Sequence, residues 1–161
     1  MRIGVATGDM VVGNIGSALS MSYTVMGDSV NLGSRLESVN KSYGTRLLVS
    51  EATMEMAKDA FLFREVDAIV VAGRDEPERV FDQLGRRGQA APESQTLAER
   101  YAAALALYRL RAWSEAEGAF RQCLEVAPED GPSWTLLGRI PALSAQTLPE
   151  TWNGAWQFAE K

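Results

Sequence analysis

Asn31 and Arg35 have the side-chain types and the spacing to bind a phosphorylated ligand. They lie in the segment YTVMGDSVNLGSRLE (23–37), where a strand pattern and a Gly-Asp turn precede a helix pattern. Residues four apart share one face of a helix, so this amide and guanidinium point the same way. Free backbone N–H groups near a helix start also attract anions. The segment predicts a phosphate-binding surface, although such a pair can also simply cap a surface helix and form salt bridges.

Composition limits the chemistry that this 161-residue chain can perform. It has no histidine, so catalysis must use carboxylates, amides, hydroxyls, Arg, Lys or a metal held by oxygen ligands. Phosphoryl transfer is the large reaction class that works with this set. The net charge of −5 argues against nucleic-acid binding, and no apolar run reaches the roughly 20 residues of a membrane span. Cys123 is the only cysteine, which fits a reducing, cytoplasmic setting.

The elements that would position Asn31 and Arg35 can be read from the N-terminal half. Strand patterns cover 2–7 and 10–15, and Gly8-Asp9 between them predicts a hairpin. A loop over 16–21 and a strand over 22–26 follow. A helix is predicted from Asp28, as its N-cap, to about Ser42, with Gly44 as its C-cap. Its core-facing stripe is formed by Leu32, Leu36 and Val39.

Further strands and helices complete an α+β pattern. Strands are expected at 46–49, 61–66, 68–71 and 79–84, and Ser50 is expected to cap a short helix that ends near Lys58. A composition rich in Gly, Ala, Pro and Ser marks 85–95 as a linker. The predicted organisation is therefore a domain at 1–84, a linker at 85–95 and a helical extension at 96–161.

The extension should contain helices at 97–110, 114–126 (capped by Ser114) and 133–140. The residues Trp113, Ala116, Phe120 and Pro128 resemble one tetratricopeptide-type repeat, with Cys123 at a position usually held by a small residue. One repeat is fewer than the roughly three that an independent solenoid needs, so the helices pack on their neighbours or bind a partner peptide. Trp152 and Trp156 predict that the tail folds back onto an apolar surface.

Residues 2–84 resemble the catalytic domain of class III adenylate and guanylate cyclases. The similarity lies, in the same order as in the family, in GVATGDMVVGNIGS (4–17), YTVMGDSVNLGSRLESVNKSYGT (23–45), LLVSEAT (47–53) and FREVDAIVVAGRDEPERVFDQLG (63–85). The resemblance implies the C-terminal part of a ferredoxin-like cyclase sandwich. It also implies an active site between two cyclase domains, often in a homodimer, and a helical tail of the kind found in bacterial members.

The resemblance implies roles for individual residues. Asn31 matches the asparagine that orients the ribose, and Arg35 matches the arginine that stabilises the phosphorus as charge builds up on it. Thr24 matches a position that contacts the purine, and threonine there favours ATP over GTP. The implied reaction converts ATP into 3′,5′-cyclic AMP and pyrophosphate with Mg or Mn.

Two departures from the family weaken the prediction of activity. The family's metal-binding aspartates and base-selecting lysine lie on strands upstream of the position of Arg2, so we expect no metal to be bound by this chain alone. The family's phosphate-binding lysine is replaced by Ala72, with Arg74 as a nearby substitute. We therefore expect these residues to be inactive without a second cyclase domain, either an identical copy or an intact cyclase.

Three alternatives remain open from the sequence. The chain is a degenerate cyclase domain that regulates a partner, or a helical interaction module on a cyclase scaffold. Otherwise Met1 marks a truncated reading frame, and the parent protein is attached to a membrane through upstream segments. A sheet without its first strands would expose an edge and an apolar face, so we expect self-association.

Overall fold

The computed structural model describes residues 1–17, 20–70 and 76–158 and has the predicted α+β architecture. Its main sheet has the strand order β1-β4-β6-β5-β7. The strands are β1 (Ile3–Val5), β4 (Leu47–Ser50), β5 (Phe61–Val70), β6 (Glu78–Arg86) and β7 (Trp156–Gln157). The pairs β1–β4 and β5–β7 are parallel, and β4–β6 and β5–β6 are antiparallel. The sheet is therefore mixed.

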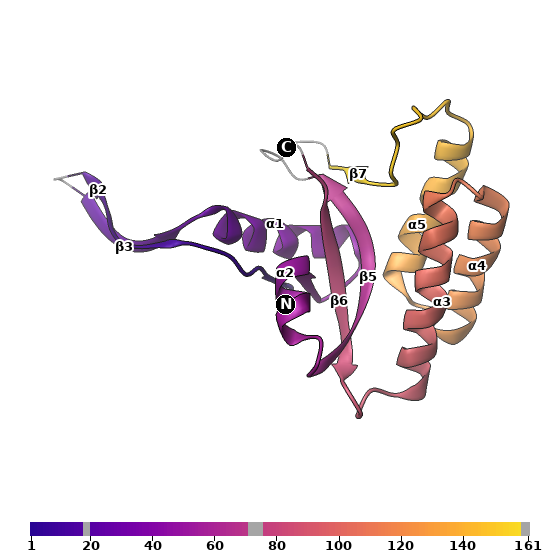
Figure 1. Cartoon of the computed structure of the whole chain (residues 1–161), viewed down its shortest axis with the longest axis horizontal. Coiled ribbons are helices and arrows are strands. Elements are labelled where there is room, and N and C mark those ends of the chain that lie inside the picture. The colour runs from indigo at the N-terminus through magenta and orange to yellow at the C-terminus, as the bar shows by residue number, and fades with distance from the viewer. Residues whose placement is uncertain (18–19, 71–75, 159–161) are drawn as a thin grey trace.

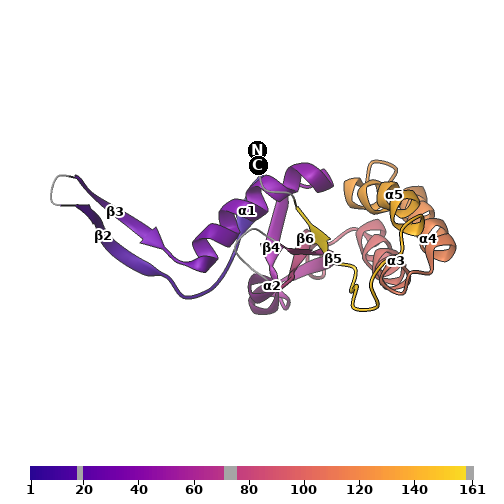
Figure 2. The ribbon, with the colours of Figure 1, turned by 90° about the horizontal axis from the view of Figure 1, so that it is seen from above.

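Helices lie on both sides of this sheet (Figures 1 and 2). One side carries α1 (Asp28–Tyr43) and α2 (Glu51–Ala57). The other carries α3 (Pro92–Arg109), α4 (Trp113–Val126) and α5 (Gly131–Ser144). A single cluster of buried apolar side chains includes residues of α1, the sheet and all three C-terminal helices. The C-terminal helices thus share a core with the segment that carries Asn31 and Arg35.

A separate hairpin projects away from the main body (Figure 1). It consists of β2 (Val11–Ser17) and β3 (Ser20–Met26), which pair antiparallel. The predicted hairpin between residues 2–7 and 10–15 is wrong, because β1 pairs with β4 and β2 pairs with β3. The alternation of apolar and polar residues along a segment identifies a strand. Which strand it pairs with depends on distant residues, here Leu47 opposite Ile3.

Helix α1 packs as its apolar spacing predicted. Leu32, Leu36 and Val39 are all buried, and Gly44 ends the helix with a left-handed φ of 66°. The predicted N-cap at Asp28 is wrong, because Gly27 occupies the cap position and no side chain caps the helix. A Cβ at Gly27 would lie 2.9 Å from the Asp9 carbonyl oxygen, so the close approach of the two segments requires glycine here.

The next elements differ from the predictions mainly in their ends. Ser50 caps α2 as predicted, since its Oγ accepts from the Thr53 N–H at 3.3 Å. The strands predicted at 61–66 and 68–71 form one strand, β5, with a register shift between Glu65 and Asp67. Strand β6 runs to Arg86 and α3 starts at Pro92, so both reach into the segment predicted as a linker.

The ends of the C-terminal helices also differ from the predictions. Helix α4 starts at Trp113 without the predicted cap by Ser114. Helix α5 is longer than predicted, and its N-cap Asp130 accepts from the Ser133 N–H at 3.0 Å.

The C-terminal tail folds back onto the body, as its tryptophans predicted. The Trp152 ring lies 5.8 Å from Tyr108 and 5.6 Å from Trp113, measured between ring centroids. Trp156 belongs to β7, which pairs with Ile69 of β5. Among the described helices, none has the length and apolar character needed to cross a membrane.

Candidate functional site

Asn31 and Arg35 lie in the N-terminal half of α1, on the face next to the buried stripe. The side chain of Asn31 is exposed and that of Arg35 is half-buried. Leu32 and Leu36 turn toward the core, and this fixes the neighbouring positions at the protein surface. Both predicted side chains therefore lie where a ligand could reach them.

Neither side chain has a polar partner within the described part of the chain. Arg35 forms no ion pair there, whereas Arg79 pairs with Glu51 and Glu65, and Arg121 pairs with Glu117. The Asn31 backbone N–H donates to the Gly27 carbonyl at 3.2 Å, so the backbone is held at the helix start while the side-chain amide has no partner among the described residues. Within residues 1–17, 20–70 and 76–158, Asn31 and Arg35 therefore form no salt bridge or side-chain cap of the kind that the sequence left open.

The other two predicted substrate contacts lie on either side of this helix in the sequence. Thr24 is exposed on β3, opposite Gly13 of β2, and the strand leads through Gly27 directly into α1. Arg74 and Ala72 lie outside the described residues. Their segment connects the end of β5 to the start of β6.

A cavity of about 400 Å³ lies at the N-terminal end of α1 but contains neither Asn31 nor Arg35. Three of its lining residues are acidic: Asp9, Asp28 and Glu78. Carboxylates repel a triphosphate and oppose the attraction of the helix start for anions. The outer face of α1, rather than this cavity, is therefore the better candidate for a phosphate.

No metal site was found in the described residues. Within 1–17, 20–70 and 76–158, no group of three or more His, Cys, Asp or Glu side chains could hold a metal ion. The exposed Asn31 and half-buried Arg35 side chains can supply hydrogen bonding and charge stabilisation.

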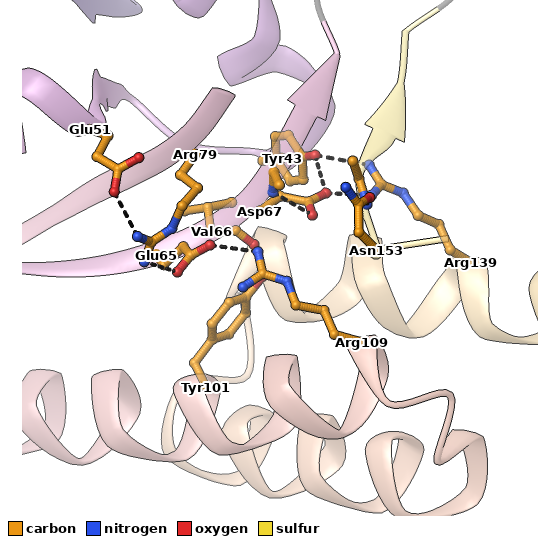
Figure 3. Close-up of polar contacts among 12 residues, drawn as sticks. Tyr43, Glu51, Glu65, Val66, Asp67, Arg79, Tyr101, Arg109, Arg139 and Asn153 are labelled. Carbon is orange, nitrogen blue, oxygen red and sulfur yellow. Dashed lines mark hydrogen bonds and ion pairs between the residues drawn. The ribbon is translucent and has the colours of Figure 1, made fainter. Parts of the chain in front are cut away.

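A buried polar network connects α1 to the C-terminal helices, and the sequence analysis did not predict it (Figure 3). The Tyr43 hydroxyl donates to Asp67 Oδ2 at 2.5 Å, and Arg139 Nη1 donates to the same oxygen at 2.7 Å. Burial raises the pKa of Asp67, and the Arg139 charge and the Tyr43 hydrogen bond oppose part of this rise. Burial also raises the pKa of Tyr43, so its hydroxyl remains a donor.

Strand β5 contacts the C-terminal helices at each of the residues 64–67. Arg64 donates to Asp130 at 2.6 Å, and Glu65 accepts from Arg109 at 2.5 Å. The Val66 carbonyl accepts from the Tyr101 hydroxyl at 2.8 Å, and Asp67 binds Arg139 as described above. The sequence contained one signal for this interface, namely charged residues within apolar segments (VDAIVV and LLGRIPAL), because a buried charge requires a partner.

The profile of the family described as "Adenylate and Guanylate cyclase catalytic domain" matches residues 1–82. The "Adenylate cyclase, terminal-differentiation specific" of Dictyostelium discoideum is 31% identical over 141 residues, covering 85% of this chain and 7% of that protein. "Adenylate cyclase 1" of Rhizobium meliloti (strain 1021) is 40% identical over 84 residues, covering 52% of this chain and 13% of that protein. The crystal structure of the adenylyl cyclase CyaB from P. aeruginosa gives a TM-score of 0.45 at 35% identity, covering 51% of this chain and 41% of that one.

This chain spans only a small part of the length of these two curated relatives. The Dictyostelium similarity is longer than the 82 residues of the family match, so it reaches into the C-terminal helices. The family match covers half of the chain. The chain belongs to the adenylate and guanylate cyclase catalytic domain family.

Proposed function

We propose that this chain supplies the substrate-contacting side of an adenylate cyclase active site and that a second cyclase domain supplies the metal-binding side. The observation that carries this proposal is that Asn31 and Arg35 lie on one accessible face of α1 and have no polar partner among the described residues, in a member of the cyclase family. The family uses divalent metals, and the described residues contain no group that could hold one. The partner would therefore bring the metal ligands.

The proposed roles follow from the chemistry of each side chain. The Asn31 amide can hydrogen-bond the ribose and orient its 3′-hydroxyl toward the α-phosphate. The Arg35 guanidinium can stabilise the charge that builds up on the phosphoryl oxygens during the displacement of pyrophosphate. The Thr24 hydroxyl can accept a hydrogen bond from the adenine amino group. In this proposal Arg74 contributes a phosphate contact in place of the lysine that Ala72 replaces. We further propose a cytoplasmic location, in keeping with the single cysteine of the chain.

A complementation assay tests the proposal. The full chain is mixed with a cyclase domain that retains both metal aspartates but has its own matching asparagine and arginine replaced. Neither protein alone should convert Mn-ATP to cyclic AMP, whereas the mixture should. Arg35→Ala should reduce the activity of the mixture by at least about 100-fold, because an electrostatic group at the transition state is lost.

Lys41→Ala is the matched control, since Lys41 is an exposed basic residue on the same helix. It should leave the activity of the mixture unchanged. A mixture that associates but forms no cyclic AMP would overturn the proposal. So would a chain that is active alone and is inactivated by Arg35→Ala.

The second candidate function is regulation by a degenerate cyclase domain, which the alanine at position 72 favours. Adding the chain to an intact cyclase separates the two functions. A change in the activity of that cyclase that survives Arg35→Ala would support regulation.

We further propose that residues 96–161 are a helical extension and that α3 and α4 form one tetratricopeptide-like pair. Ala104, Ala116 and Phe120 are buried between these helices and their neighbours, which supports this. Capture of a defined peptide by the full chain, lost on substitution at the exposed Trp134, would add a binding role.

A further inference from the structure

Helix α5 contacts the C-terminal end of α1 directly at the backbone. A Cβ added to Gly131 would lie 2.2 Å from the Tyr43 carbonyl oxygen and 3.0 Å from the Gly44 Cα. Real Cβ atoms do not come that close to backbone atoms, so only glycine fits at this position. The first residue of α5 is therefore packed against the end of the helix that carries Asn31 and Arg35.

Two side chains extend this contact along the same face of α5. Thr135 Oγ1 lies between two carbonyl oxygens, at 3.0 Å from that of Ser42 in α1 and 2.9 Å from that of Gly131 in α5. Arg139 Nη2 donates to the Tyr43 hydroxyl at 3.1 Å. Gly131, Thr135 and Arg139 follow one another at four-residue intervals and so share one face of the helix. A close backbone approach, a hydroxyl and a guanidinium thus hold the last turn of α1.

Helix α5 is also attached to the sheet. Arg139 pairs with Asp67 of β5 (Figure 3). Its guanidinium also lies 3.9 Å from the centre of the Trp156 ring of β7. The N-cap of α5, Asp130, accepts from Arg64 at 2.6 Å. Helix α5 is therefore attached to β5 at two points and transmits the position of the sheet and the C-terminal helices to α1.

Helix α1 is continuous over 16 residues, so a displacement at its end is carried to its start. At a rise of about 1.5 Å per residue, Arg35 lies roughly 12 Å along the helix axis from Tyr43. Helix α1 is in close contact with β1 on both sides of Arg35. A Cβ at Gly4 would lie 2.1 Å from the Gly33 carbonyl oxygen and 2.4 Å from the Glu37 nitrogen. A change at α5 would therefore tilt α1 about a point close to Arg35. Such a tilt turns the Asn31 and Arg35 side chains more than it moves their backbone.

We propose that α5 is a positioning element for the nucleotide site, and that Gly131, Thr135 and Arg139 set the orientation of Asn31 and Arg35 through the last turn of α1. This inference rests on the proposed cyclase function for its kinetic consequence. Its structural consequence, the restraint of α1 by α5, can be measured without any activity.

The experiment compares Gly131→Ala with Gly138→Ala in the full chain. Both replace a glycine of α5, but a Cβ at Gly138 would meet nothing within 4 Å. Hydrogen exchange measured by mass spectrometry should be several-fold faster in the last turns of α1 for Gly131→Ala and unchanged for Gly138→Ala. Thr135→Val removes the hydroxyl contacts with the Ser42 and Gly131 carbonyls and keeps the backbone approach. It gives a milder change in the same peptides and serves if Gly131→Ala does not fold.

The complementation assay supplies a second readout. In the mixture Gly131→Ala should lower kcat by roughly 10-fold and change the KM for ATP by less than about 2-fold, because a small misplacement affects the transition state most. Arg139→Lys should lose less activity than Arg139→Met, since lysine keeps the charge. Unchanged exchange in α1 for folded Gly131→Ala and Thr135→Val, or an equal change for Gly138→Ala, would overturn the inference. An inactive wild-type mixture would instead refute the proposed function and leave the exchange result valid.

Discussion

Arg139 donates to Asp67 at 2.7 Å inside the core, although the two residues lie 72 positions apart in the sequence. Asp67 is completely buried, and its carboxylate also accepts from the Tyr43 hydroxyl at 2.5 Å and from the Ala68 N–H at 2.8 Å. A buried ion pair of this kind adds little over an apolar core, but losing one partner is costly because a buried charge is left uncompensated. The pair therefore makes the C-terminal helices difficult to separate from the cyclase half.

Tyr43→Phe should destabilise the chain by about 1–3 kcal/mol. The substitution keeps the ring but removes the donor to Asp67 and leaves one Arg139 nitrogen without its partner. Urea unfolding, followed by circular dichroism, measures the change in the free energy of unfolding. Tyr23→Phe is the control, because Tyr23 is 75% exposed, and it should change this free energy by less than about 0.5 kcal/mol. Equal stability of the two variants would contradict the importance of the network.

Glu65 should make the stability of the chain depend on acid pH. Burial alone would raise its pKa, but the hydrogen bonds and charges of Arg79 and Arg109 lower it below the ordinary value of 4.5. As the pH falls below that value, the unfolded chain binds this proton before the folded chain does, so folding stability is lost. The stabilisation from ionised Glu65 is complete above the ordinary pKa and disappears as the pH falls through the folded pKa.

The measurement is the difference in the free energy of unfolding between wild type and Glu65→Gln. It should be clearly positive at about pH 7 and shrink toward about pH 3. Glu55→Gln serves as the control, since Glu55 forms an exposed pair with Lys58, and exposed pairs of this kind contribute little to stability. If the free energy of unfolding of wild type exceeded that of Glu65→Gln by more at acid pH than at neutral pH, the pKa of Glu65 would be raised rather than lowered.

Local features of the fold could be predicted from the sequence, and the features that depend on distant partners could not. The apolar stripe of α1 and the glycine at its end are local, and both are confirmed at Leu36 and Gly44. The pairing of β1 with β4 depends on residues more than forty positions away, so the Gly8-Asp9 turn signal was misleading. The boundaries of α3 and α5 were missed for a related reason, since α3 packs against α4 and β5, and α5 packs against α4 and α1, all of which lie outside the helix itself.

The residues in and around the candidate site also fall into those that the sequence could indicate and those that it could not. Asn31 and Arg35 could be proposed because their spacing matches one helix face, and their role in a site stays a prediction. The structure leaves both without polar partners in the described residues. The network of Tyr43, Asp67 and Arg139 could not be assembled from spacing, because each residue lies on a different element. Charges in otherwise apolar segments indicated only that partners must exist.

Thr24 should contribute to ATP binding in the complementation mixture. Thr24→Val removes the hydroxyl with little change in shape, and loss of one neutral hydrogen bond should raise the KM for ATP by roughly 2- to 10-fold. Because Thr24 is exposed on β3, the free energy of unfolding should stay the same. Ser22→Ala on the same strand is the control and should leave KM unchanged. If both variants raise KM equally, the effect comes from the strand and not from a contact with the purine.

The β2–β3 hairpin should drive self-association of the chain. Its apolar side chains have no core behind them: Val11 is 67% exposed, Met21 63% and Tyr23 75%. An isolated two-stranded hairpin is marginally stable in water, and burial of these side chains against a second molecule would gain about 25 cal/mol per Å². Sedimentation velocity over a concentration series should therefore detect dimers or larger species.

Tyr23→Glu should weaken this association by roughly 10-fold or more, because a charge would have to be buried or excluded from the contact. Met56→Glu is the matched control: Met56 is 78% exposed, but it lies on α2, away from the hairpin. It should leave the association constant unchanged. A monodisperse monomer at all concentrations would show that the exposed hairpin does not drive association. Equal weakening by both substitutions would instead indicate that net charge, rather than the hairpin, controls it.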